Sequence, residues 1–234
     1  MNSTLKLGQA AMPLIKGICC LLPAKHVGEL VAVIAEEQNR YDAVLLKETG
    51  GSLPCTELRR LVRLALHIDR YRLDRTVLPI YQGREQLMSG AAALLDDDTT
   101  LACGDAMRLL ALLLDKLLRG SRGSAQAKLD GLTLSAMEQR ALAAKSPNTG
   151  AVMRGSWRRK SRNQLGRSNW LDVVEAALWC FWHSDTLRDG EALLGVLLGA
   201  DIRICIVYGM LAGAFYLGKV RISHMAREHL LVTH

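Results

Sequence analysis

Residues 94–118 read LLDDDTTLACGDAMRLLALLLDKLL, and the rest of the chain is interpreted around this stretch. Residues 109–114 are all apolar, and a helix that is apolar all round is buried on most sides. The pattern predicts a core helix over residues 99–118, with Asp98 or Thr99 as its N-cap. Adjacent carboxylates repel one another, so Asp96, Asp97 and Asp98 either form a solvated cap or hold a hard cation through oxygen ligands.

Composition favours a helical protein. Hydrophobic residues make up 50% of the chain and aromatic residues 5%. Leu and Ala are abundant, and few stretches alternate apolar and polar residues as strands do. We therefore expect an all-α protein with one domain and, at most, an appended subregion.

The six cysteines show no CxxC spacing, and most of them lie in apolar helical runs. Free cysteines in such runs behave as small hydrophobic residues, which is typical of a reducing, cytoplasmic setting.

No segment is typical of a membrane span or a signal peptide. The longest apolar run, residues 204–217, is too short to cross a bilayer and contains Gly209 and Gly213. The apolar residues near the N-terminus are interrupted by Pro23. We expect a final core helix over residues 203–217, close helix packing at the two glycines, and no membrane partner.

Periodicity and turn signals outline the remaining elements. Helices are predicted in residues 27–40, 57–71, 133–144, 169–181 and 186–198. Thr133 or Ser135 would cap the third of these. Residues 120–131 are predicted as a loop and residues 146–150 as a turn, because both are rich in residues that break helices.

The formal charge of +7 is concentrated in one segment. Six cations occur there with no acid between them, namely Arg154, Arg158, Arg159, Lys160, Arg162 and Arg167. The segment is either a solvated surface loop or a contact for nucleic acid or a phosphate-bearing ligand. Burying cations without partners costs much free energy, so residues 158–162 are predicted to form an exposed loop.

Three stretches, taken in order, resemble the ADP-ribosylglycohydrolase family, which includes the dinitrogenase reductase-activating glycohydrolases. The first, DDDT at 96–99, resembles its (S/T)DDT motif at the start of a core helix. The second, NTGAVMR at 148–154, resembles its NGxxMR turn, with the asparagine placed at Asn148 or replaced by Thr149. The third, residues 172–216, resembles its EAALW helix, GGDxDT motif and AGAYYG ending.

The resemblance covers residues 94–218, which would form the core. Residues 1–93 would form an N-terminal helical region, and residues 219–234 a C-terminal tail. It implies a compact multi-helix bundle, truncated here, with a Mg²⁺ or Mn²⁺ site that hydrolyses the glycosidic bond between ADP-ribose and its acceptor. Catalytic and metal-binding roles carry over to Asp97, Asp98 and Asp201, and substrate binding to Asn148, Gly150, Met153 and Arg154.

The chain also departs from the family pattern. Arg203 and Ile204 stand where the third stretch of the family has Asp and Thr, and residues 1–93 lack the family's GDAxG motif. At about 5 Å and an effective dielectric of about 20, a guanidinium repels a divalent ion by roughly 7 kcal/mol. We therefore expect one metal ion or none, and weakened or lost hydrolysis.

Three functions stay open at this point. The first is hydrolysis of an ADP-ribosylated protein or of a small ADP-ribose-containing substrate. The second is binding of ADP-ribose or a nucleotide without cleavage, with Arg203 as a fixed cation for phosphate. The third is a basic helical protein that contacts nucleic acid. The sequence leaves the oligomeric state open. Any shared site requires the helix starts near Asp98 and Arg203 to approach each other.

Overall fold

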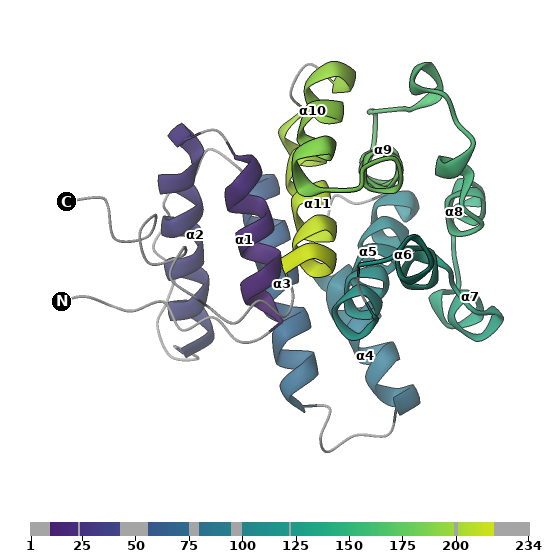
Figure 1. Cartoon of the computed structure of the whole chain (residues 1–234). Coiled ribbons are helices and arrows are strands. Elements are labelled where there is room, and N and C mark those ends of the chain that lie inside the picture. The colour runs from purple at the N-terminus through teal and green to yellow at the C-terminus, as the bar shows by residue number, and fades with distance from the viewer. Residues whose placement is uncertain are drawn as a thin grey trace.

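The computed structural model describes residues 10–22, 24–42, 56–74, 80–94, 100–121, 123–198 and 201–217. Every regular element in these ranges is a helix and none is a strand, which confirms the predicted all-α class (Figure 1). The α-helices are α1 (Ala11–Leu21), α2 (Ala24–Asp42), α3 (Thr56–Asp74), α4 (Ile80–Ala93), α5 (Leu101–Arg119), α6 (Ala125–Leu132), α7 (Ala136–Leu142), α8 (Pro147–Met153), α9 (Trp170–Trp182), α10 (Leu187–Leu198) and α11 (Ile202–Ala212). Two 3₁₀ turns, η1 (Ser156–Arg158) and η2 (Arg162–Gln164), precede α9, and a π turn, η3 (Gly213–Leu217), continues α11.

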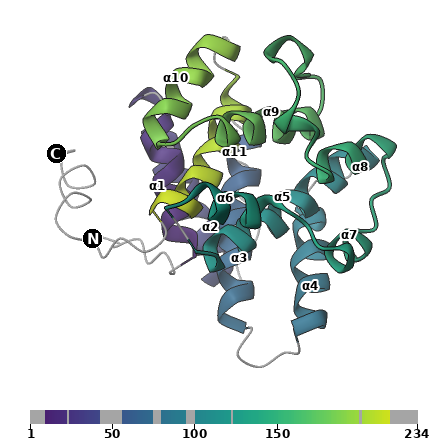
Figure 2. The same ribbon diagram turned by 45° about the vertical axis from the view of Figure 1, so that its right-hand side comes forward.

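The predicted core helix is α5. Most of its side chains are buried, and it packs against α4 and α9. Its N-cap is Thr100, whose hydroxyl accepts a hydrogen bond from the Cys103 N–H at 3.4 Å. The cap is therefore neither Asp98 nor Thr99, because the helix begins slightly later than the acidic run suggested. Figure 2 shows α5 among its neighbours from a second direction.

Helices α3 and α5 run side by side in the same direction. Near their ends, Arg72 Nη1 lies 3.2 Å from Asp115 Oδ1. Near their starts, Arg60 of α3 lies close enough to Cys103 of α5 to act on it electrostatically: burial raises the pKa of the Cys103 thiol, and the charge of Arg60 partly offsets that rise. The two helices therefore begin at the same end of the bundle (Figure 1).

The start of α11 lies at this same end. The pKa of Arg203 is raised, first by its hydrogen bond to Asp201 and also by the charge of Glu57 in the first turn of α3. The starts of α3, α5 and α11 thus share one end of the bundle. The first motif stretch, residues 96–99, lies outside the described residues, so whether it meets the third stretch there stays a prediction.

Helix α1 packs antiparallel against α11 at a contact made by glycines. A Cβ atom added to Gly17 would lie 1.9 Å from the carbonyl oxygen of Gly209. A Cβ atom added to Gly213 would lie 2.1 Å from the carbonyl oxygen of Pro13. The prediction of close packing at Gly209 and Gly213 is confirmed. Among the described helices, none combines the length and apolar character that a bilayer crossing requires.

Two local predictions were wrong. Residues 120–131 contain α6, whose N-cap Ser124 accepts a hydrogen bond from the Ala127 N–H at 3.1 Å. Residues 146–150 begin α8 rather than forming a turn, with Pro147 in the first helical turn, where its missing N–H costs nothing. The helix predicted over residues 133–144 is present as α7, which is shorter than predicted. Its N-cap is Ser135, one of the two predicted candidates.

The basic segment is only partly an exposed loop. Arg159 and Arg162 are exposed, as predicted. Lys160 Nζ, however, lies 2.6 Å from Oε2 of the buried Glu175, and the Arg158 guanidinium lies 5.0 Å from the Trp157 ring centre. The prediction was wrong for these two cations because their partners come from α9 and from a buried aromatic ring, not from neighbouring acids.

The described cysteines are free thiols, in agreement with the spacing argument. They are Cys19, Cys20, Cys103, Cys180 and Cys205.

Candidate functional site

Asp201 occupies the N-cap of α11, and Arg203 holds it there. Asp201 Oδ1 accepts hydrogen bonds from the Arg203 backbone N–H at 3.0 Å and from its Nε at 3.1 Å. Arg203 Nη2 donates to Asp201 Oδ2 at 2.8 Å. Both carboxylate oxygens are therefore engaged by one residue of the first helical turn.

The pair is partly buried and electrostatically fixed. Burial alone would raise the pKa of Asp201, but hydrogen bonds from Arg203, with the charges of Arg203 and Arg167, hold it below its ordinary value. Arg203 Nη2 also donates to the Arg167 carbonyl oxygen at 3.0 Å. The guanidinium thus links the start of α11 to the loop that leads into α9.

This arrangement does not suit a divalent ion on Asp201. An ion on Oδ2 would lie within about 5 Å of a guanidinium, and its ligand would already be hydrogen-bonded to that group. In the described ranges, no three His, Cys, Asp or Glu side chains gather as metal ligands. Asp97 and Asp98 lie outside the described residues, so a Mg²⁺ or Mn²⁺ site that includes them stays a prediction.

The middle motif stretch is tied to α5 by a buried aspartate. Asp105 is fully buried, and its Oδ2 accepts hydrogen bonds from the N–H groups of Lys145 and Ser146 and from the Thr149 hydroxyl, each at 2.8 Å. Since Asp105 lies near the start of α5, this contact places the first turn of α8 beside the beginning of the core helix. The structural role in the motif falls on Thr149, while Asn148 is exposed.

The other residues predicted to bind substrate are placed differently from one another. Met153 packs against the hydrophobic core, and Arg154 is exposed. The Arg154 guanidinium lies over Gly150, where an added Cβ atom would lie 3.2 Å from Nη1. Of this set, only Asn148 and Arg154 offer polar side chains to solvent.

Sequence reasoning missed several buried charges that fix elements of the bundle. Asp105 and Glu175 each stand in an apolar helical run, and an isolated acid in such a run is the signal that could have drawn attention to them. Glu175 binds the Ser156 hydroxyl and Lys160. The buried Lys128 donates to the Ser184 carbonyl oxygen and lies 4.6 Å from the Phe181 ring centre.

No protein-family model matches this chain. Comparison with curated proteins finds a partial similarity to the ADP-ribosylarginine hydrolase Tri1 of Pseudomonas putida (strain GB-1). The two are 34% identical over 71 residues, which make up 30% of this chain and 19% of that protein. The chain thus spans about a fifth of the length of the relative it matches. The name of this partial relative is consistent with the resemblance to the ADP-ribosylglycohydrolase family.

Proposed function

We propose that this chain is a distant relative of the ADP-ribosylglycohydrolases that binds the ADP-ribosyl group of a modified protein or small molecule. The observation that carries the proposal is the Asp201–Arg203 pair. Asp201 stands at the N-terminus of a core helix, as the third motif stretch implies, and beside it Arg203 provides a positive charge in the first helical turn.

The pair suits a ligand that carries both hydroxyls and phosphates. The ionised Asp201 carboxylate can accept hydrogen bonds from ribose hydroxyls. The Arg203 guanidinium can bind a phosphate oxygen in a charge-assisted contact, and the helix N-terminus favours negative charge at the same place. Binding of the diphosphate of ADP-ribose would draw the guanidinium partly away from Asp201.

In this proposal, binding predominates over hydrolysis. Arg203 stands where a metal ligand is expected from the family pattern, and its guanidinium engages the neighbouring carboxylate. Hydrolysis at Mg²⁺ or Mn²⁺ bound by Asp97, Asp98 and Asp201 is the second candidate, and the name of the partial relative favours it.

The first experiment is a calorimetric titration of the wild-type protein with ADP-ribose. We expect saturable binding that Arg203→Ala weakens at least about tenfold, the usual scale for one lost charge-assisted contact. Arg162→Ala removes an exposed cation and serves as the matched control. The absence of ADP-ribose binding to the wild type at millimolar concentration would overturn the proposal.

The second experiment separates the two candidates. An ADP-ribosylarginine peptide is incubated with the protein, with and without Mg²⁺ or Mn²⁺, and released ADP-ribose is measured. We expect little release under all conditions. Metal-dependent turnover that is lost in Asp201→Asn would select the hydrolase instead.

A further inference from the structure

A second polar site lies at the opposite end of α5. A solvent-open cavity of about 290 Å³ is lined there by residues of α4, of the last turn of α5, and of α6 and α7. Its lining includes Arg84, Lys116, Arg119, Asp130 and Glu138. Lys116 is about four helical turns, or roughly 20 Å, from the start of α5, so this cavity is separate from the region around Asp201.

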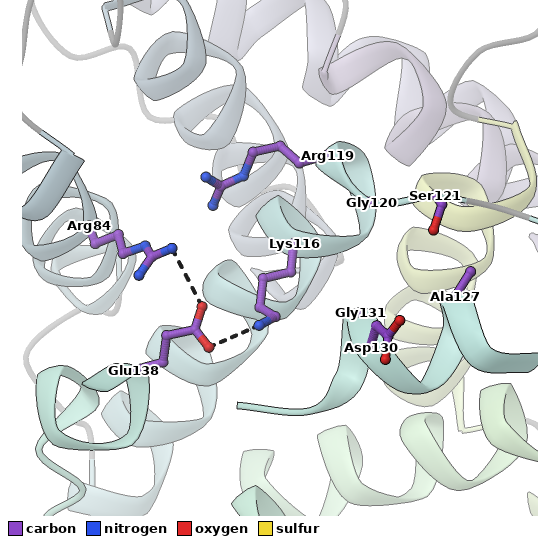
Figure 3. Close-up of a pocket in the computed structure, with 9 residues that line it drawn as sticks. All are labelled: Arg84, Lys116, Arg119, Gly120, Ser121, Ala127, Asp130, Gly131 and Glu138. Atoms are coloured by element: carbon purple, nitrogen blue, oxygen red, sulfur yellow. Dashed lines mark hydrogen bonds and ion pairs between the residues drawn. The ribbon is translucent and has the colours of Figure 1, made fainter. Parts of the chain in front are cut away.

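The buried acids near this cavity are each shared by two cations. Glu138 Oε2 lies 2.9 Å from Lys116 Nζ, and its Oε1 lies 3.6 Å from Arg84 Nη2 (Figure 3). Asp115, which precedes Lys116 in α5, pairs with both Arg72 and Arg119. One carboxylate neutralises one cation, so the cluster of Arg84, Lys116 and Glu138 retains a surplus of positive charge.

Arg84 also has an unused donor. Its Nε is buried and has no hydrogen-bond partner among the described residues. A buried N–H without a partner costs free energy, and in a folded protein such a group can bind a water or an anion. The Arg84, Lys116 and Glu138 side chains turn toward one another from three different helices in Figure 3, so this donor belongs to the same cluster.

We propose that this cavity binds a phosphate-type oxyanion, either inorganic phosphate or the phosphoryl group of a small phosphate ester. Arg84 and Lys116 would donate to its oxygens, and Arg119 would add positive charge from the end of α5. The volume lies near the lower end of the range for ligand pockets, about 300 Å³, so the cavity has room for a small phosphate ester as well as for the free ion. Asp130, exposed at the rim, opposes anion binding and sets an upper limit on its strength.

The test is an equilibrium titration with inorganic phosphate at constant ionic strength, with glycerol phosphate and acetate as further probes. A unit charge at about 6 Å and an effective dielectric of about 40 changes an affinity about tenfold. Arg84→Gln should therefore weaken phosphate binding about tenfold, and Asp130→Asn should strengthen it by a similar factor. A thermal melt shows whether Arg84→Gln folds. If it does not, the expected gain in affinity of Asp130→Asn still tests the proposal, because a damaged protein would lose affinity rather than gain it.

Two control variants show whether phosphate binds in this cavity or elsewhere on the protein. Arg140→Gln removes an exposed cation of α7 that does not line the cavity, and it should leave binding unchanged. Arg162→Gln removes an exposed cation that precedes α9 and does not line the cavity, and it should also have no effect. Tighter binding of glycerol phosphate than of phosphate would identify an ester as the ligand, and the reverse would identify the free ion. Equal phosphate affinity in wild type, Asp130→Asn and Arg140→Gln, or no saturable binding of either phosphate probe, would overturn the proposal.

Discussion

Replacing Arg203 with alanine isolates the electrostatic effect of one guanidinium on Asp201. The substitution removes the contacts of Nε and Nη2 with the carboxylate but keeps the backbone N–H that Asp201 caps. The side chains of Arg203 and Asp201 are 27% and 16% exposed, so the lost ion pair should reduce the free energy of unfolding by only about 1 kcal/mol.

The effect on metal affinity should be much larger. A divalent ion about 5 Å from a guanidinium is repelled by about 2 to 7 kcal/mol for effective dielectrics between about 80 and 20. Arg203→Ala should therefore bind Mn²⁺ at least about tenfold more tightly than the wild type. Calorimetry at neutral pH measures this, with Arg162→Ala as the control for a general loss of positive charge. Equal Mn²⁺ affinity in all three proteins would refute the electrostatic argument.

The same variant should change the response to acid. Arg203 holds the pKa of Asp201 below its ordinary value of 3.8, so the wild type has stability at neutral pH that is lost as the pH falls through that region. In Arg203→Ala this loss should be smaller. Urea unfolding between about pH 6 and pH 3 compares the two proteins.

Three further predictions concern the scaffold. Gly17→Ala should lower the free energy of unfolding, measured by urea titration, by about 3 kcal/mol, because its Cβ would lie 1.9 Å from a backbone oxygen of α11. The control Gly28→Ala, which has open space around its Cβ position, should be neutral or stabilising. Burial lowers the pKa of Lys128 from 10.5 to about 8, so between these pH values the unfolded chain binds more protons than the folded protein. The wild type should therefore gain stability relative to Lys128→Met as the pH rises from about 8 to about 10.5. The same pH dependence of unfolding free energy in both proteins would contradict this. Lys160→Gln should cost about 1 kcal/mol because it leaves the buried Glu175 without its cation, whereas Arg159→Gln should change thermal stability by no more than about 0.5 kcal/mol.

The sequence predicted those elements that a pattern of neighbouring residues is enough to define. The leucine-rich run of α5 and the glycine pair of α11 are examples, since apolar periodicity and small residues report burial and close packing directly. Helices α6 and α8 were missed because their glycines, serines and Pro147 also occur in loops. In both helices these residues lie at starts or turns that a short helix tolerates.

Long-range partners were beyond the reach of local patterns. The position of Asp201 at a helix start was predicted, but the sequence left open whether Arg203 points away or occupies the place of a metal. Lys160 has no acid near it in the sequence, yet Glu175 reaches it from the next helix because the intervening turns fold back. Asp105 fixes a segment about forty residues further along the chain.

The glycine contact between α1 and α11 has a consequence during biosynthesis. Helix α1 ends at Leu21 and its partner begins at Ile202, so at about 5 to 20 residues per second the ribosome needs roughly 10 to 40 s to supply the second helix. Until then, the face of α1 that meets α11 has no native surface to cover it, although α3, made earlier, can pack against another part of α1. The nascent chain is therefore expected to depend on holding chaperones during this interval, and the start of α11 can reach its final position only after translation has passed it.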